Sequence, residues 1–259
     1  MINLLIFLLG IAVGSFLNVL IDRIPQGQSF LKGRSHCDFC KKTLAWYDLI
    51  PILSFILLQG KCRYCHKSLS FQYPLIELAT GVIFLAAYQF FSGICLLIVG
   101  GYFLILSGLL VLFMMDLKYG ILADEIVFPL ILISVIILIY QYMIIFFMPI
   151  IIGQRVFTAI LTSTFFLSLA IITKGKGMGG GDVKLAFVMG LILGFPNIII
   201  ALYMSFLSGG VVASILLILK KKHFGQTIPF GPFLALSTIL TIFFGDQIWL
   251  WYSQKFLGW

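Results

Sequence analysis

The sequence predicts an all-α polytopic membrane protein with about eight transmembrane helices. Hydrophobic residues make up 61% of its 259 residues and charged residues only 10%, whereas soluble domains carry about 25% charged residues. Mean hydropathy is +1.15. The one long polar stretch, residues 22–74, is expected to form a loop between the first and second helices.

Eight apolar runs approach the length of about 20 residues that a helix needs to cross the hydrocarbon core. They cover residues 2–21, 75–91, 94–115, 126–147, 156–173, 183–196, 198–219 and 231–251. The first run lacks a basic start and a cleavage site, so we expect it to stay in the mature chain rather than act as a signal peptide. The sixth run is short, at roughly 21 Å of helix against a core of about 30 Å. Either the bilayer thins there or Asp182, at its start, lies recessed; both place a carboxylate in low dielectric.

The distribution of basic residues predicts the orientation. If the N-terminus is outside, the inner segments hold 15 of the 17 lysine and arginine residues, in agreement with the positive-inside rule. Those segments are 22–74, 116–125, 174–184 and 220–230. Topology and attraction to anionic membrane lipid therefore explain the net charge of +8, and we expect no nucleic-acid partner.

The cytosolic loop contains two Cys-x-x-Cys pairs. Cys37 and Cys40 are followed, after 21 residues, by Cys62 and Cys65. Four thiolates at this spacing can close a tetrahedral structural zinc site. Two disulfides are the alternative, but cytosolic thiols stay reduced. The apolar stretch 46–58 between the pairs is too short to span, so we expect it in the membrane interface or beneath the zinc loop.

Two polar residues lie in the predicted spans that flank this loop. Asn18 is inside the first span, where a hydrogen bond to a neighbouring helix explains it as well as a functional role does. Glu77 is near the inner end of the second span. Acidic residues in spans are functional candidates, but a pairing with the basic loop explains Glu77 equally well.

Two aspartates are expected on the same side of the membrane. Asp116 ends the third span and Asp182 opens the sixth, so an even number of crossings separates them. Asp182 follows the glycine-rich stretch 175–181, whose bare backbone an extended peptide can approach. This stretch also matches G-x-G-x-x-G, but an apolar membrane run precedes it instead of a strand, which excludes a dinucleotide site. The segment 230–232, which opens the last span, is expected to border the aspartates.

Two aspartates in one site cannot both ionise cheaply, so one keeps its proton and the other acts as a base. Such a pair suits an aspartyl protease, in which the base activates a water and the acid assists at the carbonyl oxygen. Paired carboxylates also suit a proton-coupled transporter. These residues alone leave both functions open, together with a zinc-bearing scaffold without catalysis.

Several motifs together resemble the type IV prepilin peptidase family. They are GSFLNVLIDRIP at 14–25, the two cysteine pairs with WYDLIPILSF and GKCRYC, the aspartate at 116, and GMGGGDVKL. The resemblance runs from residue 14 to about residue 190, with the motifs in order. It implies that Asp116 and Asp182 are the catalytic pair, and that the four cysteines bind zinc. Candidates for auxiliary roles are Asp124, Gly179, Gly181 and Lys184.

The same resemblance implies an activity and a location. The protein would be a multi-pass enzyme of the bacterial inner membrane that removes a basic leader from type IV pilin-like or pseudopilin precursors at the cytosolic face. It would also methylate the new N-terminus with S-adenosylmethionine, although no residue pattern identifies a pocket for that cofactor. The family usually has Pro-Asp-x-Leu where this chain has Ala-Asp-Glu-Ile at 123–126, so the role of Asp124 is less defined than that of Asp116.

The expected domain organisation has three parts. Residues 1–21 form the first transmembrane helix, residues 22–74 form the cytosolic zinc-binding loop associated with methylation, and residues 75–259 form the transmembrane aspartyl peptidase domain. The sequence does not identify the pathway that its substrates serve, whether pili, secretion or DNA uptake.

Overall fold

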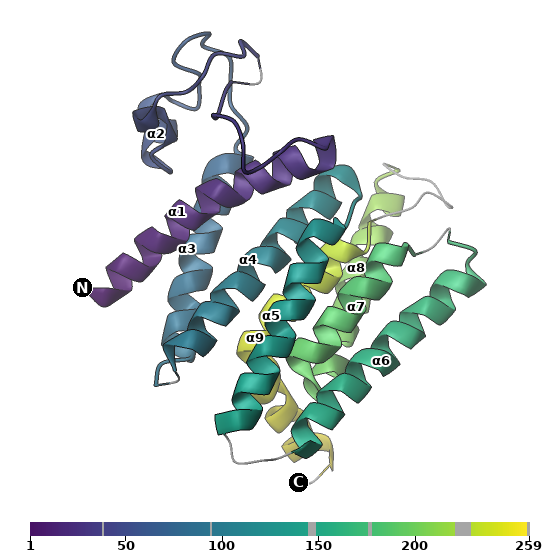
Figure 1. Cartoon of the computed structure of the whole chain (residues 1–259). Helices are drawn as coiled ribbons and strands as arrows, with labels where there is room; N and C mark the ends of the chain where they lie inside the picture. The colour runs from purple at the N-terminus through teal and green to yellow at the C-terminus, as the bar shows by residue number, and fades with distance from the viewer. Residues whose placement is uncertain (38, 94, 145–148, 176–177, 221–228, 258–259) are drawn as a thin grey trace. The chain divides into compact units, whose positions relative to one another are not determined.

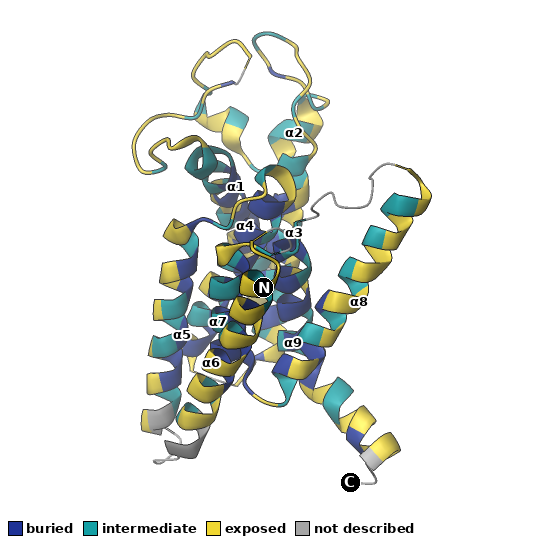
Figure 2. Ribbon diagram, turned by 90° about the vertical axis from the view of Figure 1, so that its right-hand side faces the viewer, coloured by how far each residue is buried: buried dark blue, intermediate teal, exposed yellow. Residues whose placement is uncertain are grey.

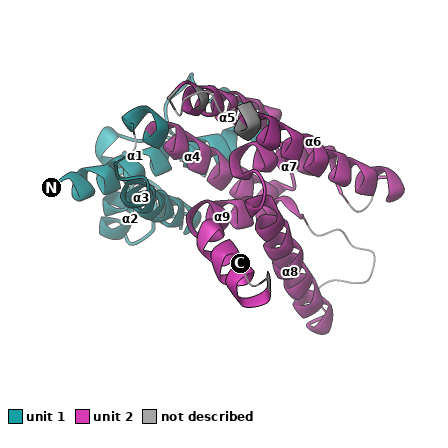
Figure 3. Cartoon of the chain, turned by 90° about the horizontal axis from the view of Figure 1, so that it is seen from below, with its two compact units in different colours: residues 1–99 teal, residues 100–259 magenta. Residues whose placement is uncertain are grey.

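The computed structural model describes residues 1–37, 39–93, 95–144, 149–175, 178–220 and 229–257. Every regular element among these residues is a helix (Figure 1), which confirms the predicted all-α class. The chain divides into two compact units, Met1–Val99 and Gly100–Trp259 (Figure 3).

The first unit consists of two long helices and the polar loop that joins them. Helices α1 (Ile2–Arg23) and α3 (Gln72–Phe90) pack along each other. The loop holds the short helices η1 (Ile24–Gln26), η2 (Trp46–Leu49) and α2 (Leu53–Leu57). This order confirms the prediction of a cysteine-bearing loop between the first two long helices.

Small residues allow α1 and α3 to approach each other closely. A Cβ atom at Gly10 would lie 2.8 Å from the Cα of Gly81, and one at Gly14 would lie 2.7 Å from the Cα of Glu77. Such glycine contacts between helices are typical of membrane proteins, where helix association depends on close packing. They bring Glu77 directly against α1.

The second unit consists mainly of six long helices. They are α4 (Leu96–Tyr119), which begins just before the unit boundary, α5 (Asp124–Ile144), α6 (Pro149–Ile172), α7 (Gly180–Leu193), α8 (Asn197–Ile218) and α9 (Gly231–Tyr252). A single π-helical turn, η3 (Ser253–Leu257), follows α9. Helix α4 packs against α5 through glycines, because a Cβ at Gly108 would lie 2.6 Å from the Cδ2 of Leu130.

Helix α7 is the buried centre of the second unit. It contacts α5, α6, α8 and α9, and Leu185, Val188 and Met189 have no exposed surface. Gly190 lies directly against the backbone of Ala159 on α6. A helix packed among other helices need not reach both membrane surfaces, because protein rather than lipid surrounds most of its length. This enclosure accounts for the 14-residue length of α7.

Each of the eight predicted apolar runs corresponds to a helix, α1 and α3 to α9. Seven of the described helices are long and apolar enough to cross a membrane, and α7 is not among them. The structure therefore confirms a multi-pass membrane protein, whereas the number of eight crossings stays a prediction. Many residues of α6 and α8 are exposed (Figure 2), and they include large apolar ones such as Phe157 and Leu207, as expected for helices that face lipid.

The helix that corresponds to the fifth predicted span extends beyond it at its N-terminal end. Helix α6 begins at Pro149, seven residues before the expected residue 156. The prediction stopped short of two polar residues, but the folded chain accommodates them. Gln154 donates a hydrogen bond to the carbonyl oxygen of Phe195 at 3.0 Å, and Arg155 donates to that of Ile192 at 3.0 Å.

Candidate functional site

The four loop cysteines meet in one cluster. The sulfur atoms of Cys37, Cys40, Cys62 and Cys65 all lie within 4.8 Å of one another, and none of the four is in a disulfide. Cys37 and Cys62 are buried, with exposed fractions of 3% and 2%. The cluster confirms that the two Cys-x-x-Cys pairs converge.

The two cysteine pairs are copies of one small hairpin. In each copy the first cysteine donates its backbone N–H to a lysine carbonyl five residues later, at 3.0 Å for Cys37 to Lys42 and 2.9 Å for Cys62 to Lys67. The residue after the second cysteine adopts a positive φ in both copies, 56° at Lys41 and 57° at His66. The repeated sequence is Cys-x-x-Cys, then lysine or histidine, lysine, threonine or serine, and leucine.

Each hairpin also covers the other. The ammonium of Lys42 lies 4.2 Å from the ring centre of Tyr64, and that of Lys67 lies 4.8 Å from the ring centre of Phe39. The two lysines and the two aromatic residues occupy equivalent positions in the repeat. These reciprocal cation–π contacts help to hold the two hairpins face to face.

The electrostatics of the cluster suit a cation. Burial raises the pKa of the Cys62 thiol, but hydrogen bonds from the backbone N–H groups of Cys65 and Tyr64 outweigh it and lower the pKa to about 7. At Cys65, the backbone N–H of Lys67 acts to lower the pKa, but burial and the other sulfur atoms raise it to about 11. Several thiolates this close repel one another unless a cation neutralises them, and a coordinated metal ion keeps thiols deprotonated. The donor set, four cysteine sulfurs, is that of a structural Zn²⁺ site.

An internal ion pair braces the loop. The guanidinium of Arg63, between the second pair of cysteines, donates to a carboxylate oxygen of Asp48 at 2.6 Å. This hydrogen bond raises the pKa of Arg63. The other oxygen of Asp48 accepts from the backbone of Ala45 at 3.2 Å and from the hydroxyl of Tyr64 at 3.3 Å. Asp48 thus ties the apolar stretch to the second hairpin.

The apolar stretch 46–58 forms two short helical turns instead of a span, as predicted. Trp46 is 77% exposed, Ile56 64% and Leu57 71%. Exposed apolar side chains of this kind suit the membrane interface. Its placement there stays a prediction.

Polar contacts join the loop to α3 and join α3 to α1. The backbone N–H of Ile52 donates to the carboxylate of Glu77 at 2.7 Å. The side-chain amide of Asn18 donates to the carbonyl oxygen of Tyr73 at 3.2 Å, and the hydroxyl of Tyr73 donates to Asp22 at 3.1 Å. The predicted hydrogen bond from Asn18 to a neighbouring helix is therefore confirmed. Glu77 does contact the loop, as one alternative predicted, but through the backbone of Ile52.

The second candidate site lies in the other unit, around Asp116. This aspartate is in the last turn of α4 and is 6% exposed. Its Oδ2 atom is buried and has no hydrogen-bond partner in the part of the chain that the structure describes. The carboxylates of Asp116 and Asp182 interact electrostatically, so the structure brings the two predicted aspartates together.

Asp182 lies in the first turn of α7 and is 7% exposed. Its Oδ2 atom accepts the backbone N–H of Gly179 at 3.0 Å, which caps the helix N-terminus and fixes the carboxylate. Gly179 and Gly180 are exposed, and a Cβ at Gly180 would meet nothing within 4 Å. An open strip of backbone therefore adjoins a buried carboxylate. Residues 176 and 177 of the glycine-rich stretch lie outside the described residues.

Two further residues, Leu122 and Gly231, lie beside the aspartate pair. Leu122 follows α4 and packs against Gly181, whose added Cβ would lie 2.8 Å from the Cβ of Leu122. A Cβ at Gly231 would lie 2.6 Å from the Oδ2 of Asp116 and 3.1 Å from the Cδ2 of Leu122. Gly231 was expected to border the site, and it does. Leu122 was missed, because an apolar residue after a glycine carries no sequence signal for such a position.

Asp124 occupies a different setting from the two buried aspartates. It opens α5, its side chain is 49% exposed, and it pairs with the ammonium of Lys184 on α7 at 2.7 Å. The pair joins the start of α5 to the first turns of α7.

Apolar helices, a loop with four converging cysteines and a pair of buried aspartates define an integral membrane protein with a cysteine cluster that could hold a metal ion and with a carboxylate site. Residues 8–91 match the bacterial peptidase A24 N-terminal domain, and residues 103–214 match the type IV leader peptidase family. The chain belongs to the type IV leader peptidase family.

Curated relatives match the chain over nearly its whole length. A prepilin leader peptidase/N-methyltransferase of Bacillus subtilis (strain 168) is 32% identical over 98% of this chain and 99% of the relative. Proteins of the same name from Stutzerimonas stutzeri and Neisseria gonorrhoeae are 32% and 33% identical, over 95% and 93% of this chain and 92% and 90% of the relatives. No solved structure matches the chain.

Proposed function

We propose that this protein is a membrane aspartyl endopeptidase that removes the leader from type IV pilin-like or pseudopilin precursors and then N-methylates the new N-terminus. The family match and the names of the full-length relatives support both activities. The observation that supports the aspartyl chemistry is the buried carboxylate pair beside an exposed glycine backbone. The comparisons lend the proton-coupled transporter no support.

Each aspartate has a role in the proposed cleavage. Two carboxylates in one buried site share a proton. The ionised member takes a proton from a water molecule, which attacks the carbonyl carbon of the scissile bond. The protonated member donates a hydrogen bond to the carbonyl oxygen and then helps to protonate the leaving amine. Asp182 accepts the N–H of Gly179, a hydrogen bond that favours its ionised form, so we assign the protonated role to Asp116.

The residues next to the pair support substrate binding. Gly180 is exposed and is the first residue of α7, where backbone N–H groups have no partner within the helix, so its N–H can serve an extended peptide. Gly181 lets Leu122 pack close to the first turn of α7. The ion pair between Asp124 and Lys184 holds α5 against that turn.

We further propose that Cys37, Cys40, Cys62 and Cys65 hold one structural zinc ion. The ion would stabilise a loop that buries few apolar residues of its own. Four cysteine ligands saturate tetrahedral zinc, so the metal would leave no open position for a substrate or a water. S-adenosylmethionine is the methyl donor that the N-methyltransferase names of the relatives imply.

The location and the domain division are also proposals. The split of basic residues supports an inner-membrane protein with its N-terminus outside and with both sites at the cytosolic face. The family matches, to residues 8–91 and 103–214, support a methylation part that includes loop 22–74 and a peptidase part that lies within residues 75–259.

The decisive experiment incubates the purified full-length protein with a pilin-like precursor and reads the product masses. We expect Asp116→Asn and Asp182→Asn each to abolish cleavage while the protein still inserts, because an amide can neither act as the base nor share the proton. Asp246→Asn is the matched control. Asp246 is exposed and lies about 22 Å along α9 from Gly231. Full cleavage by either site variant would refute the aspartyl mechanism.

A further inference from the structure

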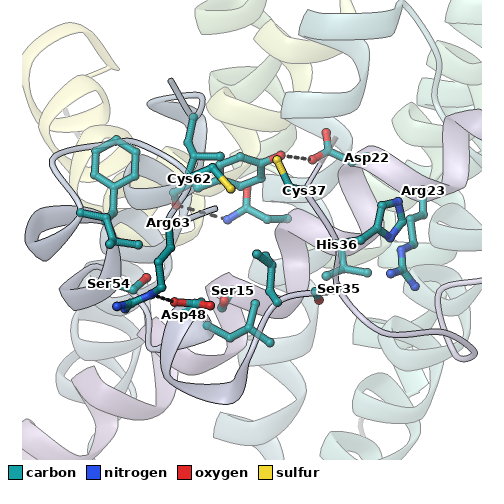
Figure 4. Close-up of a pocket in the computed structure, with 18 of the residues that line it drawn as sticks. Ser15, Asp22, Arg23, Ser35, His36, Cys37, Asp48, Ser54, Cys62 and Arg63 are labelled. Carbon is teal, nitrogen blue, oxygen red and sulfur yellow. Dashed lines mark hydrogen bonds and ion pairs between the residues drawn. The ribbon is translucent and has the colours of Figure 1, made fainter. Parts of the chain in front are cut away.

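The first unit contains a pocket that the proposed cleavage does not use. Its volume is about 230 Å³. Helices α1 and α3 contribute Asn18, Asp22 and Glu77, and the cysteine loop contributes Cys37 and Cys62 to its lining. Figure 4 shows Asp22 on one side of these cysteines and the pair of Asp48 and Arg63 on the other. The pocket therefore adjoins the proposed zinc site.

Buried hydrogen-bond acceptors line this pocket. Glu77 is 6% exposed and Asn18 is 4% exposed. The amide nitrogen of Asn18 donates two hydrogen bonds, to the carbonyl oxygens of Gly14 and Tyr73, both at 3.2 Å. Its Oδ1 atom is buried without any partner among the described residues. A buried acceptor without a donor is costly, so a ligand that donates hydrogen bonds there would be favoured.

The two arginines that line the pocket, Arg23 and Arg63, already have hydrogen-bond or ion-pair partners. Arg23 donates hydrogen bonds of 3.2 to 3.4 Å to the carbonyl oxygens of three loop residues, Ser29, Lys32 and Arg34. Arg63 pairs with Asp48. The other basic residues of the lining, His36 and Lys41, are exposed. The interior therefore offers a ligand the unpartnered amide oxygen of Asn18. Beside it lie the carboxylates of Asp22 and Glu77, which already accept hydrogen bonds from Tyr73 and Ile52 but, as carboxylates, can accept more than one.

This set of acceptors selects an ammonium group. An ammonium brings three donors and a positive charge, which match two carboxylates and an amide oxygen. The volume is below the range of about 300–1,000 Å³ found for pockets that enclose a drug-sized ligand. It suits a group of amino-acid size. Both reactants of the proposed methyl transfer present one, the methionine part of S-adenosylmethionine and the N-terminal residue of the cleaved product.

We propose that this pocket is the N-methyl-transfer site, and that Asn18, Asp22 and Glu77 receive the ammonium group of a reactant. The inference rests on the methyltransferase activity of the proposed function. The transfer joins the amine nitrogen to the methyl carbon and breaks the carbon–sulfur bond, whose electron pair stays on sulfur. An N-terminal ammonium releases one proton in this exchange, and the carboxylate of Glu77 is positioned to accept it.

The test measures binding as well as activity. Glu77→Gln keeps an oxygen for the N–H of Ile52, and Asp22→Asn keeps one for the hydroxyl of Tyr73, so each removes charge with little change of shape. Glu125→Gln, exposed at the start of α5, is the matched control. The full-length proteins, in detergent and with zinc content verified, are titrated with S-adenosylhomocysteine and with a peptide that carries the mature N-terminus, free or acetylated.

We expect at least one probe to bind Glu77→Gln and Asp22→Asn about 10- to 100-fold more weakly than the wild type, because a charge-assisted hydrogen bond is lost. Methylation of the cleaved peptide should fall to the same extent, whereas cleavage of the precursor should persist. Weaker binding of S-adenosylhomocysteine would assign the pocket to the methyl donor. If the variants bind the free peptide more weakly than the wild type does, and binding of the acetylated peptide does not change, the pocket is assigned to the product amine.

Three outcomes would overturn the proposal. They are unchanged binding of both probes, unchanged methylation, and loss of cleavage in both variants with zinc retained. If one variant loses its zinc, the other variant decides. If the wild type binds the probes as expected but cleaves no precursor, the proposed peptidase fails while the ammonium pocket stands.

Discussion

Replacement of Gly231 by alanine is the most specific perturbation of the aspartate pair. The added Cβ would lie 2.6 Å from the Oδ2 atom and 3.0 Å from the Cγ atom of Asp116. Nonbonded atoms of this size settle at about 3.5–4.0 Å, so the carboxylate has to move by roughly 0.5–1 Å. A displacement of about 1 Å at a reacting group can cost about 10²-fold in rate. We therefore expect cleavage by Gly231→Ala to slow by roughly 10²-fold, or about 2.7 kcal/mol in the barrier.

The same substitution should leave the fold intact. Gly231 is the first residue of α9 and does not have a positive φ, and alanine is favoured over glycine by up to about 1 kcal/mol in a helix. Gly210→Ala in α8 is the control, because a Cβ there meets no atom within 4 Å. The assay is the turnover number for precursor cleavage, with the unfolding midpoint and the methylation of pre-cleaved peptide measured in parallel. A wild-type turnover number in Gly231→Ala would refute the assignment of Asp116.

Three further perturbations test the rest of the structure. Asp124→Asn should reduce cleavage by about fivefold or less, because exposed ion pairs contribute only about 0–1 kcal/mol. Cys37→Ser and Cys62→Ser should each lose zinc and make the loop sensitive to protease, with methylation reduced more than cleavage. Gly14→Leu should lower the unfolding midpoint by the equivalent of about 1–3 kcal/mol, because a Cβ there lies 2.7 Å from the Cα of Glu77 and forces α1 and α3 apart.

Each of these three predictions has a contrary result. Complete loss of cleavage in Asp124→Asn would make Asp124 the first catalytic partner in place of Asp116. One zinc ion per chain in both serine variants, or a purified protein with disulfides and no metal, would overturn the zinc assignment. A wild-type unfolding midpoint in Gly14→Leu would show that α1 and α3 tolerate a wider separation.

The sequence alone determined the helices and the cysteine cluster, because both depend on local chemistry. Inside a membrane a backbone satisfies its hydrogen bonds within a helix, so eight apolar runs predicted eight helices. Their ends were less predictable. Arg155 lies just before the fifth predicted run, yet it is inside α6, where its guanidinium donates a hydrogen bond to a carbonyl oxygen on another segment. The cysteine spacing was sufficient because each pair forms its own hairpin, stabilised by bonds within a few residues.

The aspartate pair could be predicted only in part from the sequence. Counting the crossings predicted that Asp116 and Asp182 lie on one side of the membrane, and the short sixth run predicted a low-dielectric setting for Asp182, through either a thinned bilayer or a recessed position. The electrostatic contact between the two carboxylates depends on how α4 and α7 pack. The catalytic role of the pair stays a prediction.

Only the tertiary structure decided which residues surround the two candidate sites. Gly231 faces Asp116 from a helix that begins more than 100 residues later in the chain. Asn18 reaches the backbone of Tyr73 across 55 residues of sequence, and Glu77 reaches the backbone of Ile52 across 25. Local propensity and hydrophobic period determine that a helix forms and how long it is. The neighbours of each face follow from side-chain packing between distant segments, and a single sequence does not display that packing.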